Sequence, residues 1–80
     1  MENRIVVFDI ECTCWDKIEN VDINEREIIE IGAVKLDNSL EICDSFDIFV
    51  KPEKNPTLSK YCLELTHIQQ SDVDFAVEFN

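Results

Sequence analysis

Apolar residues of this chain gather in three extended runs. Residues 5–10 are β-branched or aromatic except for Asp9, a pattern typical of a strand that is buried on both faces at the centre of an α/β sheet. Residues 28–36 form a second apolar run, and residues 40–50 resume an extended pattern after the turn residues Asp37-Asn38-Ser39. The second and third runs therefore predict a β-hairpin.

Two polar stretches interrupt these runs. Residues 14–26 are mostly charged or polar, with a few scattered apolar anchors, and we expect them to form a loop. Pro52 and Pro56 bracket a second loop, because proline fixes φ and has no N–H to give to a strand ladder.

The last third of the chain carries two helix-start signals. Ser59 is placed to cap a short helix that runs to about Glu64. Ser71 or Asp72 is placed to cap another helix, which begins near Val73 and continues to the chain end. The expected order of elements is three strands followed by two short helices.

The acidic balance limits what the surface can bind. The 80 residues include 18 acidic and 7 basic residues, a formal charge of −11, so this segment by itself repels polyphosphate. Contact with nucleic acid would have to run through bound cations or through basic residues supplied elsewhere. For most of the carboxylates, a solvated surface position is the simpler interpretation.

Cellular location and redox state follow from the chain start and the cysteines. The first apolar run is too short, and too soon interrupted by Asp9, for a signal peptide or a membrane span, so we expect a cytoplasmic, intracellular protein with no membrane contact. Its cysteines should then remain free thiols. A zinc site that includes His67 is disfavoured, because only one pair of cysteines is close and its spacing is too short. The four cysteines are Cys12, Cys14, Cys43 and Cys62.

Asp9 and Glu11 are the candidate catalytic residues. They stand two apart near the C-terminal end of the first strand and therefore project from the same face. Carboxylate oxygens suit hard divalent ions, and two carboxylates on one strand can serve the two metals of phosphodiester hydrolysis. Two other acidic pairs have the same spacing but do not follow a buried strand, namely Glu25 with Glu27 and Asp72 with Asp74.

Residues 6–15 (VVFDIECTCW) resemble the first motif of the DEDDh-type 3′-to-5′ exonucleases, in the subgroup related to the histone-mRNA and RNA-interference 3′ exonucleases and the KapD-like proteins. Residues 27–34 are similar to the second strand of that family and residues 49–52 to its third. Residues 55–66 resemble the segment that follows, which leads into a helix after residues 68–70. The similarity covers nearly the whole chain in order.

This resemblance implies an α/β, ribonuclease H-like exonuclease fold. Residues 1–80 would be the N-terminal portion of one domain, a three-stranded antiparallel β-meander followed by two short helices. Asp9 and Glu11 would bind two Mg²⁺ or Mn²⁺ ions, and a metal-bound water would cleave the last phosphodiester at the 3′ end of RNA or DNA. Cys12 and Thr13 would lie beside the terminal nucleotide, and Leu65 and Thr66 would line its pocket. Ordinary packing is an equal alternative for Thr13 and Leu65.

Other parts of the family site have no counterpart in the 80 residues. The resemblance implies a third carboxylate and a His-x-x-x-x-Asp motif later in the domain. His67 and Asp72 fit that spacing, but they come before any fourth strand, and we interpret the match as coincidence. His67 stands where these relatives have glycine, so a positive φ there would cost about 1 kcal/mol.

Three interpretations of function remain open. The chain is an incomplete, inactive portion of an exonuclease, or a catalytically dead binding or assembly module, or a structural α/β fragment without a ligand. The family places the first strand centrally, and its parallel neighbour would come from the later half. In this chain we therefore expect an unpaired sheet edge at the first strand, and self-association through it.

Overall fold

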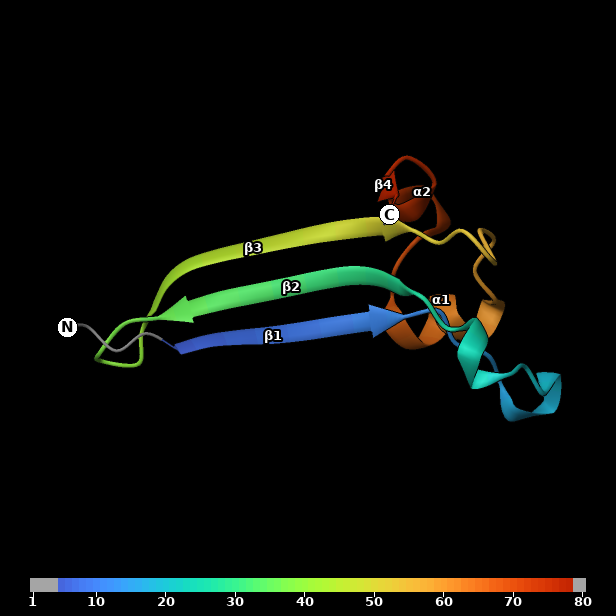
Figure 1. Ribbon diagram of the computed structural model, residues 1–80, viewed down its shortest axis with the longest axis horizontal. Coiled ribbons are helices and arrows are strands. Elements are labelled where there is room, and N and C mark those ends of the chain that lie inside the picture. The colour runs from blue at the N-terminus through green and yellow to red at the C-terminus, as the bar shows by residue number, and fades with distance from the viewer. Residues whose placement is uncertain (1–4, 79–80) are drawn as a thin grey trace.

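A four-stranded sheet and two short helices make up the computed structural model, which describes residues 5–78 (Figure 1). The strand order is β1-β2-β3-β4, with the first three strands antiparallel and β4 parallel to β3. The predicted three-stranded meander followed by two short helices is confirmed. The elements are β1 (Ile5–Cys12), η1 (Lys17–Glu19), η2 (Ile23–Glu25), β2 (Ile28–Leu36), β3 (Ile42–Lys51), α1 (Lys60–Thr66), α2 (Gln70–Asp74) and β4 (Val77–Glu78), where η marks a 3₁₀ turn.

The hairpin between β2 and β3 closes on Asp37. Its carboxylate accepts hydrogen bonds from the backbone N–H groups of Ser39 at 2.8 Å and Glu41 at 3.1 Å. Leu40 takes the left-handed conformation with φ 62°. A short aspartate that bonds backbone groups two and four residues on is a common way to fix a turn, and this turn sets the register of the two long strands.

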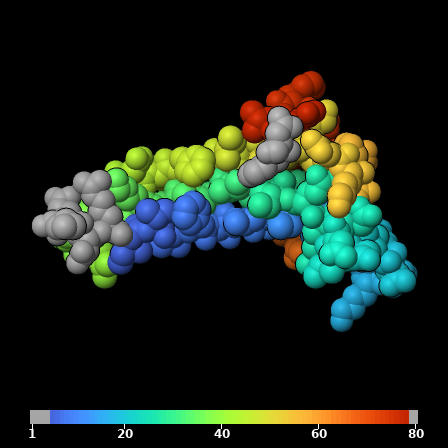
Figure 2. Space-filling view, viewed as in Figure 1, coloured from blue at the N-terminus to red at the C-terminus, as the bar shows by residue number. Residues whose placement is uncertain are grey.

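The core lies at one end of the sheet. Its buried cluster consists of Ile29, Leu58, Cys62, Ile68 and Val73. Both helices gather where β1 and β3 end, and the remainder of β1, β2 and β3 extends away as a narrow arm (Figures 1 and 2). Within residues 5–78, no helix covers that arm, and its stability therefore depends on the strand ladder and on cross-strand side-chain pairs.

The first strand is an edge strand with exposed side chains. Val6 is 49% exposed and Phe8 63%, so the prediction of a strand buried on both faces at the sheet centre is wrong for this chain. The physical reason is that the helices pack only against the far end of the sheet. The expectation of an unpaired edge is confirmed, because among the described strands β1 pairs with β2 alone.

The first helix follows the prediction and the second does not. Ser59 caps α1 as expected. The second helix begins earlier than predicted, because a capping box forms in which the backbone N–H of Gln69 donates to Asp72 at 2.9 Å. It ends at Asp74, and Val77–Glu78 then pair with β3 as β4. Residues 79–80, to which the predicted helix extended, lie outside the described residues.

Within the same 5–78 range, neither helix has the length or the apolar character needed to cross a membrane.

The predicted loop between β1 and β2 contains the two 3₁₀ turns, capped by Asp16 and Asp22.

Candidate metal and nucleic-acid site

Asp9 and Glu11 share one sheet face with two further carboxylates. Asp9 lies opposite Gly32, which lies opposite Asp47, and Glu11 lies opposite Glu30. Residues directly opposite on adjacent strands project to the same side. The four acids therefore surround one stretch of the sheet face, as the predicted same-face arrangement of Asp9 and Glu11 requires.

Gly32 keeps the middle of this face open. A Cβ at Gly32 would lie 3.8 Å from the Asp9 carbonyl oxygen and 3.9 Å from a carboxylate oxygen of Asp47, so it would fill the space between them. An open depression of about 530 Å³ includes Asp9, Glu30, Gly32 and Asp47 among its lining residues. Three of the four acids, Asp9, Glu30 and Asp47, thus face a solvent-accessible hollow.

The pKa of Glu30 reflects the negative charge of the neighbouring acids. Partial burial, a hydrogen bond with Asp47, and the negative charges of Asp47, Glu11 and Asp9 raise the pKa of the Glu30 carboxyl above its ordinary value. Like charges brought together on a partly desolvated face disfavour full ionisation. A bound cation would relieve that repulsion, so the charge distribution of this face suits a positive ligand.

The donor chemistry of the pair fits a hard divalent ion. Asp9 and Glu11 offer the carboxylate oxygens that Mg²⁺ and Mn²⁺ prefer, and Mg²⁺ is often bound through one or two carboxylates with water or substrate phosphate in its other positions. In the part of the chain from Ile5 to Glu78, no three His, Cys, Asp or Glu side chains converge to hold a metal by themselves. The pair therefore fits part of a coordination shell.

The thiols at the end of β1 are poorly reactive groups. Burial is the main cause that raises the pKa of Cys12, and burial together with a hydrogen bond to Cys62 raises the pKa of Cys14 to about 11. All four cysteines are free thiols in the structure. The thiolate is the nucleophilic and metal-binding form, so packing is the main role of Cys12 and Cys14.

Thr13 has its polar atoms engaged with the backbone. The residue is 2% exposed. Its hydroxyl oxygen accepts a hydrogen bond from the N–H of Glu27 at 2.9 Å, and its own N–H donates to the Glu27 carbonyl at 2.8 Å. These contacts join the two ends of the β1–β2 loop. They favour packing over contact with a nucleotide as the role of Thr13.

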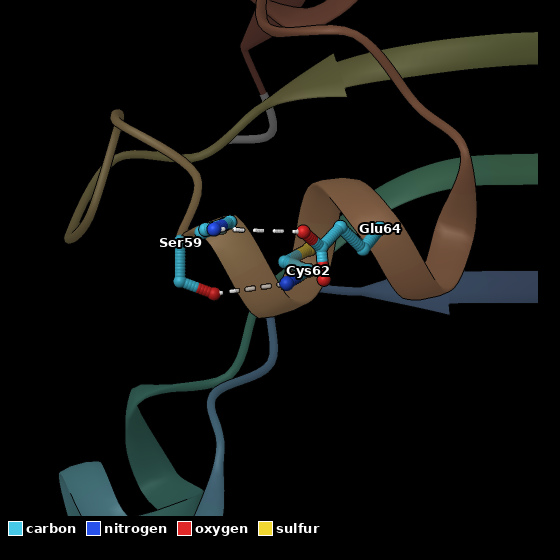
Figure 3. A network of polar contacts seen from close by, with 4 residues as sticks. Ser59, Cys62 and Glu64 are labelled. Carbon is cyan, nitrogen blue, oxygen red and sulfur yellow. Dashed lines mark hydrogen bonds and ion pairs between the residues drawn. The ribbon is translucent and has the colours of Figure 1, made fainter.

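Helix α1 is anchored beside the end of β1. The Ser59 hydroxyl donates to the Cys14 carbonyl oxygen at 2.6 Å and accepts from the Cys62 N–H at 3.0 Å, the second contact being drawn in Figure 3. The Cys62 thiol lies 3.8 Å from the Cys12 carbonyl oxygen. The structure therefore holds α1 at the same end of the sheet as Glu11.

Leu65 and Thr66 differ in availability. Leu65 is 60% exposed on α1. The Thr66 hydroxyl donates to the Cys62 carbonyl at 2.8 Å and accepts from the Ile68 N–H at 3.2 Å, which completes the end of the helix. Of these two residues, Leu65 has the side chain that is open to a ligand.

His67 and Asp72 have local structural roles. His67 ends α1 with φ 62°, and its N–H donates to the Leu63 carbonyl. Asp72 belongs to the capping box of α2. Each residue thus has a role at the end of its own helix, which agrees with the interpretation of their spacing as coincidence.

Sequence reasoning did not single out Glu30, Asp47 or the role of Glu27. The Glu27 carboxylate accepts hydrogen bonds from the backbone N–H groups of Glu53 at 2.9 Å and Lys54 at 2.6 Å, so it holds the loop after β3. Glu30 and Asp47 join Asp9 and Glu11 only through the strand register. Pairing the strands in the correct register would have placed Glu30 and Asp47 beside Asp9 and Glu11.

This chain is similar to several known proteins. The family model of RNase_T, described as exonuclease, matches residues 6–80. Human ERI1 exoribonuclease 2 is 42% identical over 74 residues, which cover 91% of this chain and 10% of that protein. The 3′-5′ exonuclease Snipper of Drosophila melanogaster is 41% identical over 71 residues, which cover 88% of this chain and 25% of that protein.

A solved nuclease domain has the same fold as this chain over almost its whole length. The nuclease domain of 3′hExo, a DEDDh family member bound to rAMP, superposes with a TM-score of 0.87 at 40% identity, covering 98% of this chain and 38% of that one. The exonuclease-type fold expected from the sequence is confirmed. The chain spans between a tenth and a quarter of the length of the two curated relatives.

Proposed function

Because this chain belongs to the RNase_T exonuclease family, we propose that it contributes the first carboxylate strand to a metal-dependent 3′-to-5′ exonuclease that acts on RNA. One observation carries the proposal. Asp9 and Glu11 project from the same face of β1, beside Glu30 and Asp47, in a chain that superposes almost entirely on a DEDDh nuclease domain. RNA is the favoured substrate because human ERI1 exoribonuclease 2 is similar and the superposed domain was bound to rAMP.

The residues of this site would have distinct roles in the reaction. Asp9 and Glu11 hold Mg²⁺ or Mn²⁺, which when bound supplies activation of water and neutralisation of phosphate charge. Gly32 keeps the face beside them open. Leu65, exposed on the helix anchored at the end of β1, offers an apolar surface to the terminal nucleotide. Cys12 and Thr13 support that end of the strand by packing.

The chain would be one portion of a catalytic unit. We propose that residues 1–80 are the N-terminal portion of a single exonuclease domain and that they do not degrade RNA processively alone. The other acids and the general base that the resemblance implies have no counterpart among them. Groups that act as a unit fail together when one is missing, so we expect hydrolysis near background.

A second candidate function, an assembly module, is favoured by the free edge of β1. Its side chains Ile5, Val6, Val7, Phe8 and Ile10 are each about half exposed or more, and an unpaired apolar strand recruits another strand. We propose self-association through this edge. We propose separately that the protein is intracellular and cytoplasmic, where thiols are kept reduced.

The exonuclease proposal is tested with a chimera, in which residues 1–80 are followed by the remainder of the nuclease domain of 3′hExo. Single-turnover degradation of a 5′-labelled RNA with Mn²⁺ is measured for the 80-residue chain, the chimera, and the chimera with Asp9→Asn. Glu41→Gln, an exposed acid on the distant hairpin turn, is the matched control. Stepwise shortening from the 3′ end by the chimera, lost with Asp9→Asn and kept with Glu41→Gln, supports the proposal. A folded chimera that leaves the RNA intact would refute it.

A further inference from the structure

The loop between β1 and β2 forms a second pocket. Residues 13–27 leave the end of β1 and project beyond the sheet, in the lower right of Figure 1 and Figure 2. A cavity of about 310 Å³ lies within this loop. Its lining residues are Trp15, Asp16, Lys17, Asn20, Val21 and Arg26.

The pocket joins an aromatic ring with two positive charges. Trp15 is the single tryptophan of the chain, and it is half-buried. Lys17 and Arg26 are exposed at the same cavity. The third charged lining residue, Asp16, uses its carboxylate to accept the Ile18 N–H at 3.3 Å as the cap of η1. Asp16 and Asn20 are the other polar groups of the lining, and Trp15, Lys17 and Arg26 are the groups that suit a base and its phosphates.

Arg26 connects the pocket to the carboxylate face. Its positive charge acts to lower the pKa of both Cys12 and Cys14, against the larger effect of burial, and the negative charge of Glu11 acts on the same two thiols. Arg26 and Glu11 are thus both close to the end of β1. The loop pocket and the Asp9–Glu11 face therefore lie at the same end of β1.

We propose that this pocket is a nucleotide subsite, in which Trp15 stacks on a base of single-stranded nucleic acid and Lys17 and Arg26 contact its phosphates. The proposal rests on the proposed function, because that function supplies the strand. Stacking on an aromatic ring accepts every base, so the subsite would add affinity without sequence preference. Lys17 and Arg26 are the two basic residues of this loop, and the acidic residues around them limit phosphate contact to these two side chains.

The single tryptophan provides a direct measurement. The 80-residue chain is titrated in EDTA at low salt with a six-nucleotide oligouridylate, and the emission of Trp15 is recorded. The anisotropy of a fluorescein-labelled copy of the oligonucleotide reports binding anywhere on the chain. Hydrolysis and metal are absent from both readouts. A failure of this proposal is therefore distinguishable from a failure of the exonuclease proposal, which only the chimera assay measures.

Saturable quenching of Trp15 that follows the anisotropy curve is expected. Two phosphate contacts predict a slope of about −1.4 in log affinity against log salt, and Lys17→Gln or Arg26→Gln should each reduce it to about −0.7. Trp15→Ala should weaken binding about 5-fold or more, whereas Trp15→Phe, which keeps a ring, should retain most of it. Lys35→Gln, on the arm of the sheet, is the charge-matched control and should bind like the unaltered chain.

Three results would overturn the subsite. One is an anisotropy rise without a change in Trp15 emission, and another is an absence of binding in both assays. The third is an equal loss of affinity with Lys35→Gln and with Arg26→Gln, which would show general charge attraction in place of a built pocket. Circular dichroism of each variant identifies any that fail to fold. If Trp15→Ala unfolds, Trp15→Phe and the two charge variants still decide the matter.

Discussion

The hydroxyl of Ser59 donates a hydrogen bond to the carbonyl oxygen of Cys14 at 2.6 Å, across 45 residues of sequence. The same hydroxyl oxygen accepts the Cys62 N–H at 3.0 Å and so caps α1 (Figure 3). One side chain therefore fixes the start of the helix and ties it to the segment that leaves β1. The helix that carries Leu65 is positioned relative to the Asp9–Glu11 strand through this contact.

Ser59→Ala should lower the free energy of unfolding by about 1 to 3 kcal/mol. The loss combines a missing N-cap, worth about 1 kcal/mol, with a Cys14 carbonyl left without its partner. Urea unfolding followed by circular dichroism measures the change. Ser39→Ala, in the exposed hairpin turn, is the matched control and should stay within about 0.5 kcal/mol. Equal stability of the two variants would contradict the role assigned to Ser59.

His67→Gly should stabilise the chain. His67 ends α1 with φ 62° and an exposed side chain, a conformation that costs a non-glycine residue about 1 kcal/mol. Glycine removes that cost, so we expect a gain of about 0.5 to 1 kcal/mol in urea unfolding. His67→Ala keeps a Cβ in the same backbone conformation and should show no gain. A loss of stability with His67→Gly would show that the imidazole makes a contact that outweighs the backbone strain.

Glu30 should make the folded chain less stable as the pH rises. Because the pKa of Glu30 is raised in the folded state, the folded chain holds a proton there that the unfolded chain has released. The stability that this proton contributes is present below the unfolded pKa and is lost as the pH rises through the raised one. Glu30→Gln should therefore raise the urea midpoint at neutral pH and flatten its decline as the pH rises above the ordinary glutamate pKa of about 4.3. Glu41→Gln, at an exposed position, is the control. If it flattens the pH dependence of the urea midpoint equally, the effect does not come from Glu30.

Self-association should depend on the face of β1. Phe8 is 63% exposed on the edge strand, and Ile18 is 90% exposed on the loop. Lysine at either position changes the net charge equally, but only Phe8→Lys places a charge on the strand edge, where charges oppose pairing. Light scattering at increasing concentration should show association of the unaltered chain and of Ile18→Lys, and less of it for Phe8→Lys. A monodisperse monomer of the unaltered chain at high concentration would contradict self-association.

The strands and the first helix could be predicted because their signals are local. The apolar runs gave β1 and β2, the turn residues around Asp37 gave the hairpin, and Ser59 gave the start of α1. The exposure of β1 could not be predicted in the same way, since a β-branched run is identical whether or not a layer covers it. Burial depends on what packs against a strand, and here the helices reach only its end.

The candidate site was partly predictable for a related reason. The spacing of Asp9 and Glu11 places them on one face, and period-two geometry needs no further information. Glu30 and Asp47 join them through the cross-strand register, which includes irregularities at Glu11/Cys12 and at Lys35/Leu36. A shift by one residue would turn both acids to the other face. The second helix was misplaced because its cap is Gln69, a residue type that rarely signals a helix start.

Binding of Mn²⁺ to the carboxylate face tests the central claim most directly. Paramagnetic broadening of backbone amide signals is recorded for the 80-residue chain at low Mn²⁺ concentration. The double variant Asp9→Asn/Glu11→Gln and the control Glu19→Gln/Glu41→Gln, which removes the same charge from exposed positions, are compared with it. We predict weak, saturable broadening centred on Asp9, Glu11, Gly32 and Asp47 that disappears in the first double variant and persists in the second. Broadening spread evenly over the acidic residues, or unchanged in the Asp9→Asn/Glu11→Gln chain, would contradict the assignment of this strand as the metal-binding strand of an exonuclease.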